Sequence, residues 1–158
     1  MDDTFAELEP FFAAYLNRLG PAQRRKIYRK IGMELRKANA KRIAANVQPD
    51  GSPMQARKPR PRMKDARGRI RRSGKMFRKL RQVKNLKIRT MGDGVSVGYE
   101  GPVARTARVH QYGLRGFVGR TKAGKVVQAK YPARVLLDFG PDDVGAITGL
   151  ALHFIQDQ

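Results

Sequence analysis

The chain lacks cysteine and tryptophan and has only two histidines, and these absences exclude several classes of protein. Without cysteine there is no disulfide scaffold and no thiolate site for zinc or an iron–sulfur cluster. His110 and His153 are too few for a metal centre built from several histidines. Aromatic residues make up only 8% of the chain, so we expect a small hydrophobic core. We also expect no metal and no cofactor.

Long apolar runs are absent as well. The longest run, residues 11–16, is about a third of the roughly 20 residues that a membrane-spanning helix needs. Asp2 and Asp3 make the first residues acidic, whereas a secretory signal begins with positive charge. We therefore expect no membrane span, no export by that route, and folding in the cytoplasm.

Acidic residues are scarce relative to basic ones: 13 stand against 34, which gives a formal net charge of +21. The excess is local, because residues 55–90 hold sixteen bases against Asp65 alone, whereas residues 91–158 hold eight bases and six acids. Residues 24–42 form a second basic region, with nine bases against Glu34. This second region is either a solvated helix face or a surface that faces a polyanion.

The centre of the charge excess has few apolar residues, and its like charges repel one another. Such a segment cannot offset its ordering entropy by burial, so we expect residues 55–74 to form an extended basic arm. Lysine and arginine displace counterions from nucleic acid and bind its backbone without reading sequence. The alternative is an assembly arm that folds against an acidic protein. The bases of the arm are Arg57, Lys58, Arg60, Arg62, Lys64, Arg67, Arg69, Arg71 and Arg72.

Helical periodicity dominates the first third of the chain. A helix is predicted to begin at Pro10 and to end before Gly20 and Pro21, and a longer one to cover residues 22–46. Residues 48–51, Gln-Pro-Asp-Gly, then form a turn that ends the helical region.

The second half alternates apolar and polar residues between turn signals. The pattern predicts one hairpin from residues 86–91 and 95–99, and another that pairs residues 117–118 with 126–127. We also expect a short helix over residues 73–80 and a strand over residues 131–139.

A final helix is predicted to begin at Pro141, where Asp142 and Asp143 complement the helix dipole. The whole reads as an α+β fold, in which the antiparallel hairpins form a small sheet. Its predicted parts are an N-terminal helical region (1–54), the basic arm (55–74) and a β-rich core with the last helix (75–158), in one domain.

No catalytic constellation accompanies these elements. His110 has no acidic neighbour in the sequence to orient it, and the serines do not lie in a nucleophile elbow. The glycine-rich stretch from Gly119 to Lys125 is not a phosphate loop, because Val126 stands where that motif requires serine or threonine. We therefore do not expect an enzyme.

Five segments carry a resemblance when they are taken together and in order: residues 23–36, 42–53, 75–81, 107–116 and 131–139. They resemble the phage virion-morphogenesis family, which contains the tail completion protein S of contractile-tailed phages. The chain departs from the family pattern at Asp138, where the family commonly has glycine.

The resemblance implies a structural protein of the virion that acts late in tail assembly. Such a protein caps the head-proximal end of the tail and makes it competent to join a filled head. By analogy it forms a homo-hexameric ring, and its neighbours are the tail tube, the tail terminator or the head connector. Double-stranded DNA passing through the lumen is a further candidate partner. The alternative function is that of a sequence-nonspecific nucleic-acid-binding protein of nucleoid or RNA-binding type.

Two short segments, residues 110–113 and 131–134, supply the aromatic and planar cationic groups that commonly anchor interfaces. The alternative role for both segments is a turn that locks the sheet. Within the implied ring, the basic arm either wraps a neighbouring subunit or the tail tube, or faces the DNA path. The candidate interface residues are His110, Gln111, Tyr112, Gly113, Tyr131, Pro132 and Arg134.

Overall fold

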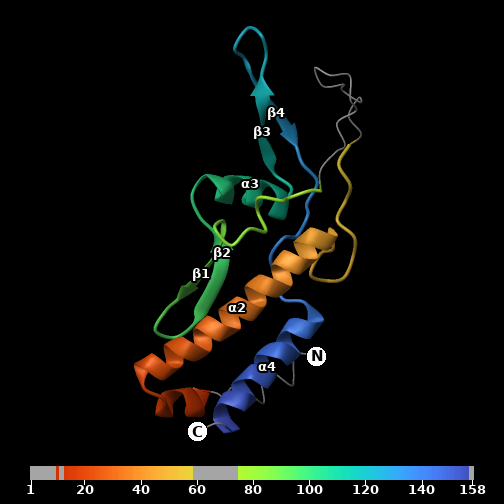
Figure 1. Ribbon diagram of the computed structural model, residues 1–158. Coiled ribbons are helices and arrows are strands. Elements are labelled where there is room, and N and C mark those ends of the chain that lie inside the picture. The colour runs from red at the N-terminus through yellow and green to blue at the C-terminus, as the bar shows by residue number, and fades with distance from the viewer. Residues whose placement is uncertain (1–9, 11–12, 59–74, 157–158) are drawn as a thin grey trace, which may run out of the picture.

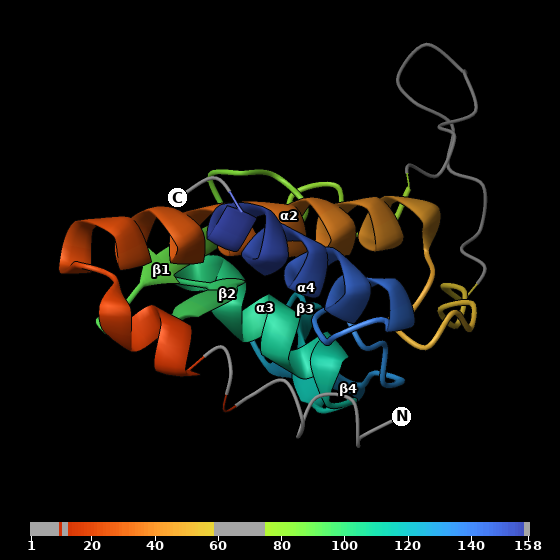
Figure 2. The same ribbon diagram turned by 90° about the horizontal axis from the view of Figure 1, so that it is seen from below.

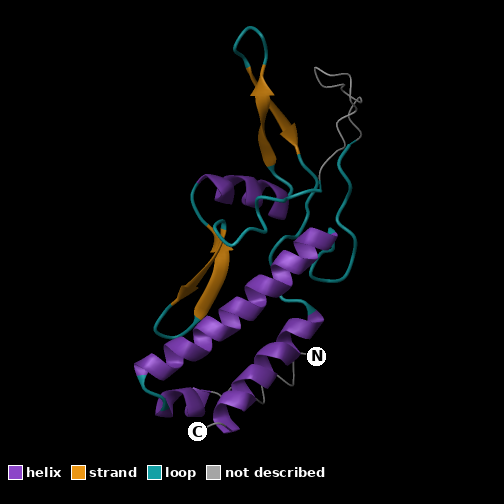
Figure 3. Cartoon of the chain, viewed as in Figure 1, coloured by secondary structure: helices purple, strands orange, loops and turns teal. Residues whose placement is uncertain are grey.

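The computed structural model describes residue 10, residues 13–58 and residues 75–156. Its elements confirm the α+β class: helices α2, α3 and α4 are accompanied by two small antiparallel hairpins (Figures 1 and 3). Pro10 and residues 13–18 are helical, as the sequence predicts. The prediction of a basic arm falls mostly on residues 59–74, which lie outside the described residues. No helix of the described part combines the length and the apolar character that crossing a membrane requires.

Helix α2 (Pro21–Ala45) is the longest element and closely matches the predicted helix. Pro21 suits the first turn, because a residue there needs no backbone donor. Asn46 ends the helix in the left-handed conformation (φ 57°), and its N–H bonds back to the Ile43 carbonyl. The helix therefore begins and ends where local chemistry dictates.

Helix α2 lies between the first hairpin and α4 (Pro141–Gln156), as Figures 1 and 2 show. The hairpin pairs β1 (Leu86–Thr90) with β2 (Val95–Tyr99), close to the predicted ranges. The hairpin approaches α2 at Gly32, where a Cβ would lie 2.6 Å from Ile88 and 2.7 Å from Val95. Glycine is therefore needed at this crossing.

On the other side of α2, a partly buried ion pair ties the helix to the start of α4. Arg42 Nη2 donates to Asp143 Oδ2 at 2.7 Å, and the Gly140 N–H donates to the same oxygen at 2.8 Å. Burial raises the pKa of the Asp143 carboxyl, but these two hydrogen bonds and the Arg42 charge lower it by more. The acid that the sequence offered as a capping charge is thus also an anchor between helices.

The second hairpin, β3 (Arg115–Arg120) with β4 (Val126–Lys130), forms in the predicted region, although Phe117 pairs with Gln128 rather than with residues 126–127. A register shift between Phe117 and Gly119 marks a bulge. The two hairpins do not join into one small sheet, as expected, but remain two separate sheets of two strands. Helix α3 (Pro102–Gln111), which the sequence analysis did not predict, separates them along the chain.

Two predicted elements are wrong. Residues 76–85 form turns rather than a short helix, because Phe77 adopts a left-handed backbone (φ 57°) that a right-handed helix cannot contain. Residues 131–139 are irregular rather than a strand, because their N–H groups bond to groups other than a neighbouring strand. Val135 N–H donates to Gln48 Oε1 at 2.9 Å, and Leu136 N–H donates to Gln111 Oε1 at 2.7 Å.

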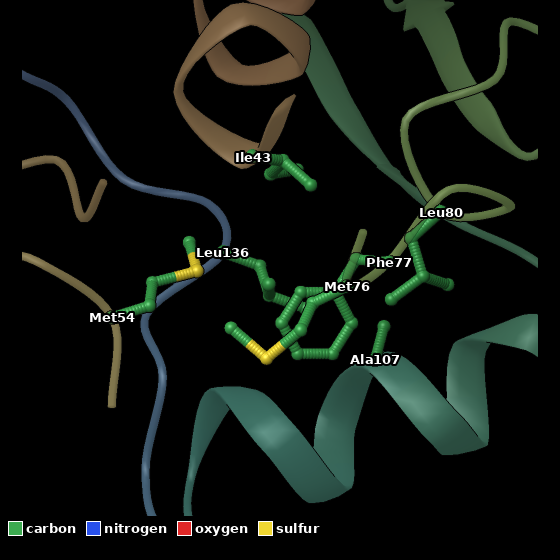
Figure 4. Close-up of a cluster of buried hydrophobic side chains, with 7 residues drawn as sticks. All are labelled: Ile43, Met54, Met76, Phe77, Leu80, Ala107 and Leu136. Carbon is green, nitrogen blue, oxygen red and sulfur yellow. The ribbon is translucent and has the colours of Figure 1, made fainter. Parts of the chain in front are cut away.

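The buried cluster at the centre of the molecule is small and is assembled from many elements (Figure 4). It draws one side chain from α2, one from the loop that follows α2, three from the turns at 76–80, one from α3 and one from the 131–139 segment. Its members are Ile43, Met54, Met76, Phe77, Leu80, Ala107 and Leu136. This cluster holds the 76–80 turn and the irregular 131–139 segment in place, and both border the candidate site.

Candidate interface around His110 and Arg134

A cavity of about 720 Å³ opens where the chain enters and leaves the basic arm. We call it the basic cavity. Seven of its lining residues are cations and none is acidic: Arg57, Lys58, Lys75, Arg78, Lys79, Lys130 and Arg134. The remaining wall is mainly apolar and aromatic and comes from the 76–80 turn, α3, the β3–β4 hairpin and residues 131–132. An apolar hollow with a cationic rim suits a partner that carries both apolar and anionic groups.

His110 lies in the last turn of α3, between two aromatic rings. The centroids of Phe77 and Tyr131 are each 4.8 Å from the imidazole centroid, both in edge contacts. Arg134 Nη1 lies 3.3 Å from His110 Nδ1. Since a guanidinium only donates, Nδ1 accepts and the neutral ring carries its proton on Nε2.

Charge and burial both favour the neutral form of this histidine. Burial lowers the pKa of His110 below its ordinary value, and the positive charges of Arg134 and Arg57 lower it further. The described contacts of the ring are thus aromatic and cationic. They suit packing, whereas a general base usually has an acidic group to orient it.

Arg134 holds the chain at the point where the basic arm begins. Its side chain is buried, with Nε 2.6 Å from the Gln55 carbonyl and Nη2 3.2 Å from the Ala56 carbonyl. The backbone N–H of Arg134 donates to the His110 carbonyl at 2.7 Å. Burial, followed by the nearby Arg57, lowers the pKa of the guanidinium, which is still charged at neutral pH. Arg134 therefore fixes residues 55–56 against the end of α3.

The side-chain amide of Gln111 holds the irregular 131–139 segment. Its Oε1 accepts from the Leu136 and Leu137 N–H groups, and its Nε2 donates to the Leu137 carbonyl at 2.9 Å. Gly113 follows with a positive φ of 64°, and a Cβ there would lie 2.9 Å from the Ala133 nitrogen. Both residues join the turn after α3 to the 131–139 segment.

The structure brings most of the predicted interface residues together. His110, Tyr131, Pro132 and Arg134 line the basic cavity with Arg57 and Lys58. Gln111 and Gly113 contact the 131–139 segment, which forms part of the cavity wall, and Tyr112 is exposed beside them. The interface role of all these residues stays a prediction. The remaining predicted arm residues, Arg60, Arg62, Lys64, Arg67, Arg69, Arg71 and Arg72, lie outside the described residues.

Sequence reasoning missed four cations of the cavity, Lys75, Arg78, Lys79 and Lys130. The first three belong to residues 75–80, where bases are interspersed with Met76, Phe77 and Leu80, a pattern that predicts a helix. Within residues 10, 13–58 and 75–156 no three acidic or histidine side chains gather as a metal site would require.

Comparison with known proteins decides the family. The model of the phage virion morphogenesis family matches residues 3–156, nearly the whole chain. This chain belongs to that family. It is also 33% identical over 153 residues to the tail completion protein S of Escherichia phage P2. The match covers 96% of this chain and 97% of the P2 protein. No solved structure matches the chain.

The basic cavity is lined by segments that carry the resemblance to this family. The turn at 75–81, the end of α3 and residues 131–139 were three of the five segments behind the resemblance, and all three meet at the cavity. This virion-morphogenesis protein therefore concentrates several of its family-like segments at one place.

Proposed function

We propose that this protein completes the phage tail, capping its head-proximal end so that the tail can join a filled head. The observation that carries the proposal is the 33% identity to the P2 tail completion protein over almost the full length of both chains. Because the match leaves neither chain with a large unmatched part, it supports a common role for the whole protein rather than for one module.

The proposed role is structural and not enzymatic. The protein acts as a ring, a homo-hexamer matched to the six-fold tail, and contacts the tail tube, the tail terminator or the head connector. It folds in the host cytoplasm and remains in the virion. The aromatic and cationic contacts of His110 support this role, because they are contacts of packing.

Double-stranded DNA passes through such a ring, and the seven cations of the basic cavity support a contact with its backbone. Phosphate contacts of this kind hold DNA without reading its sequence. The basic arm continues the same charge along the chain, and we propose that it serves assembly while some of its bases face the DNA path.

Deleting the gene from the phage tests the proposal. Lysates are expected to contain filled heads and otherwise complete tails that have not joined, and the wild-type protein supplied in trans should restore joined particles. Electron microscopy and plaque counts measure both results. A normal yield of joined particles from the deletion would contradict the proposal.

The cations also support the alternative function, a free nucleic-acid-binding protein. That function requires steeply salt-dependent binding to bare duplex without any association with tails. Sedimentation of the tagged protein with purified tails separates the two functions, since only the tail completion role predicts co-sedimentation.

A further inference from the structure

The β3–β4 hairpin exposes apolar side chains on both of its faces. Val126 and Val127 are adjacent on β4 and therefore point to opposite faces; they are 45% and 39% exposed, and every other residue of that strand is exposed as well. On β3, Phe117 and Val118 lie at the bulge and are 62% and 50% exposed. Figure 1 shows the hairpin projecting from the rest of the molecule beyond α3.

Such a ribbon is unstable when it stands alone. A hairpin of two strands is marginally stable in water, and both of its strands present unpaired edges. Within the described residues the hairpin makes few contacts outside itself, chiefly with α3. A partner that covers Phe117 and its neighbours would remove this cost.

The hairpin is also strongly basic, which restricts the chemistry of that partner. Residues 115–130 contain no acidic residue. Their bases are Arg115, Arg120, Lys122, Lys125 and Lys130. The partner surface is therefore expected to combine apolar and acidic groups.

A groove with this composition lies at the start of α4. It has a volume of about 400 Å³ and contains Phe139, which is 61% exposed. Asp50 and Asp138 line it and are exposed, and the exposed Asp142 directly follows Pro141 of its wall. We call it the acidic groove; its apolar wall includes Pro49, Val135, Pro141 and Val144.

The acids of this groove are available to a partner, whereas three other described acids are already paired; the remaining described acid outside the groove is Asp93, which is exposed in the β1–β2 turn. Asp143 is bound to Arg42, Glu34 to Lys37, and Glu100 to Arg89. Asp50 and Asp138 accept backbone N–H groups of nearby residues through Oδ1, which leaves Oδ2 of each for a further partner.

We propose that the β3–β4 hairpin of one copy docks in the acidic groove of a second copy. Figure 1 shows the hairpin tip well separated from the start of α4, so one chain does not satisfy its own groove. The contact joins two different surfaces, head to tail, and repeats until the ring closes. The inference rests on the ring of the proposed function and identifies the two surfaces that build it.

The lack of cysteine makes a direct test possible. Gln128→Cys marks the exposed face of the hairpin, and Gly145→Cys marks α4 next to the acidic groove. A short bismaleimide is expected to join a mixture of the two full-length variants into covalent dimers, and neither variant alone. Val83→Cys, at a site 63% exposed outside both surfaces, is the matched control for either partner.

Two further results decide the inference. Adding Phe117→Ser to the hairpin variant or Phe139→Ser to the groove variant should lower the yield of dimers by about tenfold, as expected for loss of an aromatic anchor. A chain with both cysteines should give a ladder that ends in a closed ring. Equal yields with the Val83→Cys control, or crosslinks of Gln128→Cys with itself, would overturn the inference.

Failure here is distinguishable from failure of the proposed function. The crosslinking uses purified protein and measures contact between copies, whereas the deletion measures head joining. If the deletion abolishes joining but the purified variants give no crosslink between positions 128 and 145, only the docking inference is overturned.

Discussion

At the scale of single residues, His110 predicts how stability depends on pH. Its pKa is lower in the folded chain than in the unfolded chain, so the unfolded chain takes up a proton first as the pH falls. The free energy of unfolding should therefore be constant above about pH 7.5 and decrease as the pH falls through the ordinary histidine pKa. Urea unfolding between pH 5 and 8 measures this.

Replacing the ring tests the assignment. His110→Gln should flatten this dependence, while His153→Gln, which leaves His110 in place, should retain it. If the slope in this range persists in His110→Gln, the dependence comes from another group.

Gly113 is a second residue whose role is specific to its position. It needs a positive φ, and a Cβ would also meet the Ala133 backbone at 2.9 Å. Gly113→Ala should lower the free energy of unfolding by more than the roughly 1–2 kcal/mol that the left-handed conformation alone costs. Gly124→Ala is the control, since Gly124 has a φ of 81° with no atom within 4 Å of its Cβ position. Equal losses in the two variants would rule out the contact with Ala133.

At the scale of elements, the crossing of α2 and the first hairpin depends on Gly32. A methyl group there would overlap Ile88 and Val95, so Gly32→Ala should destabilise the protein by about 1–3 kcal/mol through overpacking. Gly149→Ala, in α4 with open space around its Cβ position, should instead stabilise it by up to about 1 kcal/mol through helix propensity. Urea unfolding measures both, and a stabilising Gly32→Ala would contradict the close approach.

Elements whose signals are local could be predicted from the sequence. Helix α2 and both hairpins follow from periodicity and turn residues that are near one another in the chain. The supposed strand at 131–139 failed because Gln48 and Gln111, distant in sequence, take its backbone N–H groups. Helix α3 was missed because its short stretch contains few large apolar residues to mark a period.

The candidate site was predictable only in part, for a similar reason. The charge of residues 57–58 and the interface chemistry of His110 and Arg134 are visible in the sequence. Their convergence on one cavity is not, because it depends on Phe77 adopting a positive φ and turning the chain back toward α3. The exposure of Phe117 was likewise hidden, since an alternating pattern indicates a face but not whether anything covers it.

At the scale of the whole molecule, the net charge of +21 resolves into surfaces of opposite sign. The basic cavity and the projecting hairpin carry cations, while the start of α4 carries the exposed acids Asp138 and Asp142. A uniformly basic protein would repel its own copies, whereas this separation allows them to meet head to tail. In the ring that we propose, the cations outside this contact remain exposed to the DNA path.

The salt dependence of DNA binding tests whether the cations of the basic cavity contact the DNA backbone. Each phosphate contact contributes about 0.9 to the slope of the logarithm of affinity against the logarithm of salt concentration. If Lys75, Arg78 and Lys79 each contact a phosphate, changing all three to glutamine should reduce the slope by about 2.7. The matched control changes Arg25, Lys26 and Arg29, three exposed bases of α2, and removes the same net charge. Fluorescence anisotropy with a labelled duplex should show a markedly smaller slope only for the cavity variant. An equal reduction in both would mean that DNA responds to net charge alone, and the basic cavity would then have no special place on the DNA path.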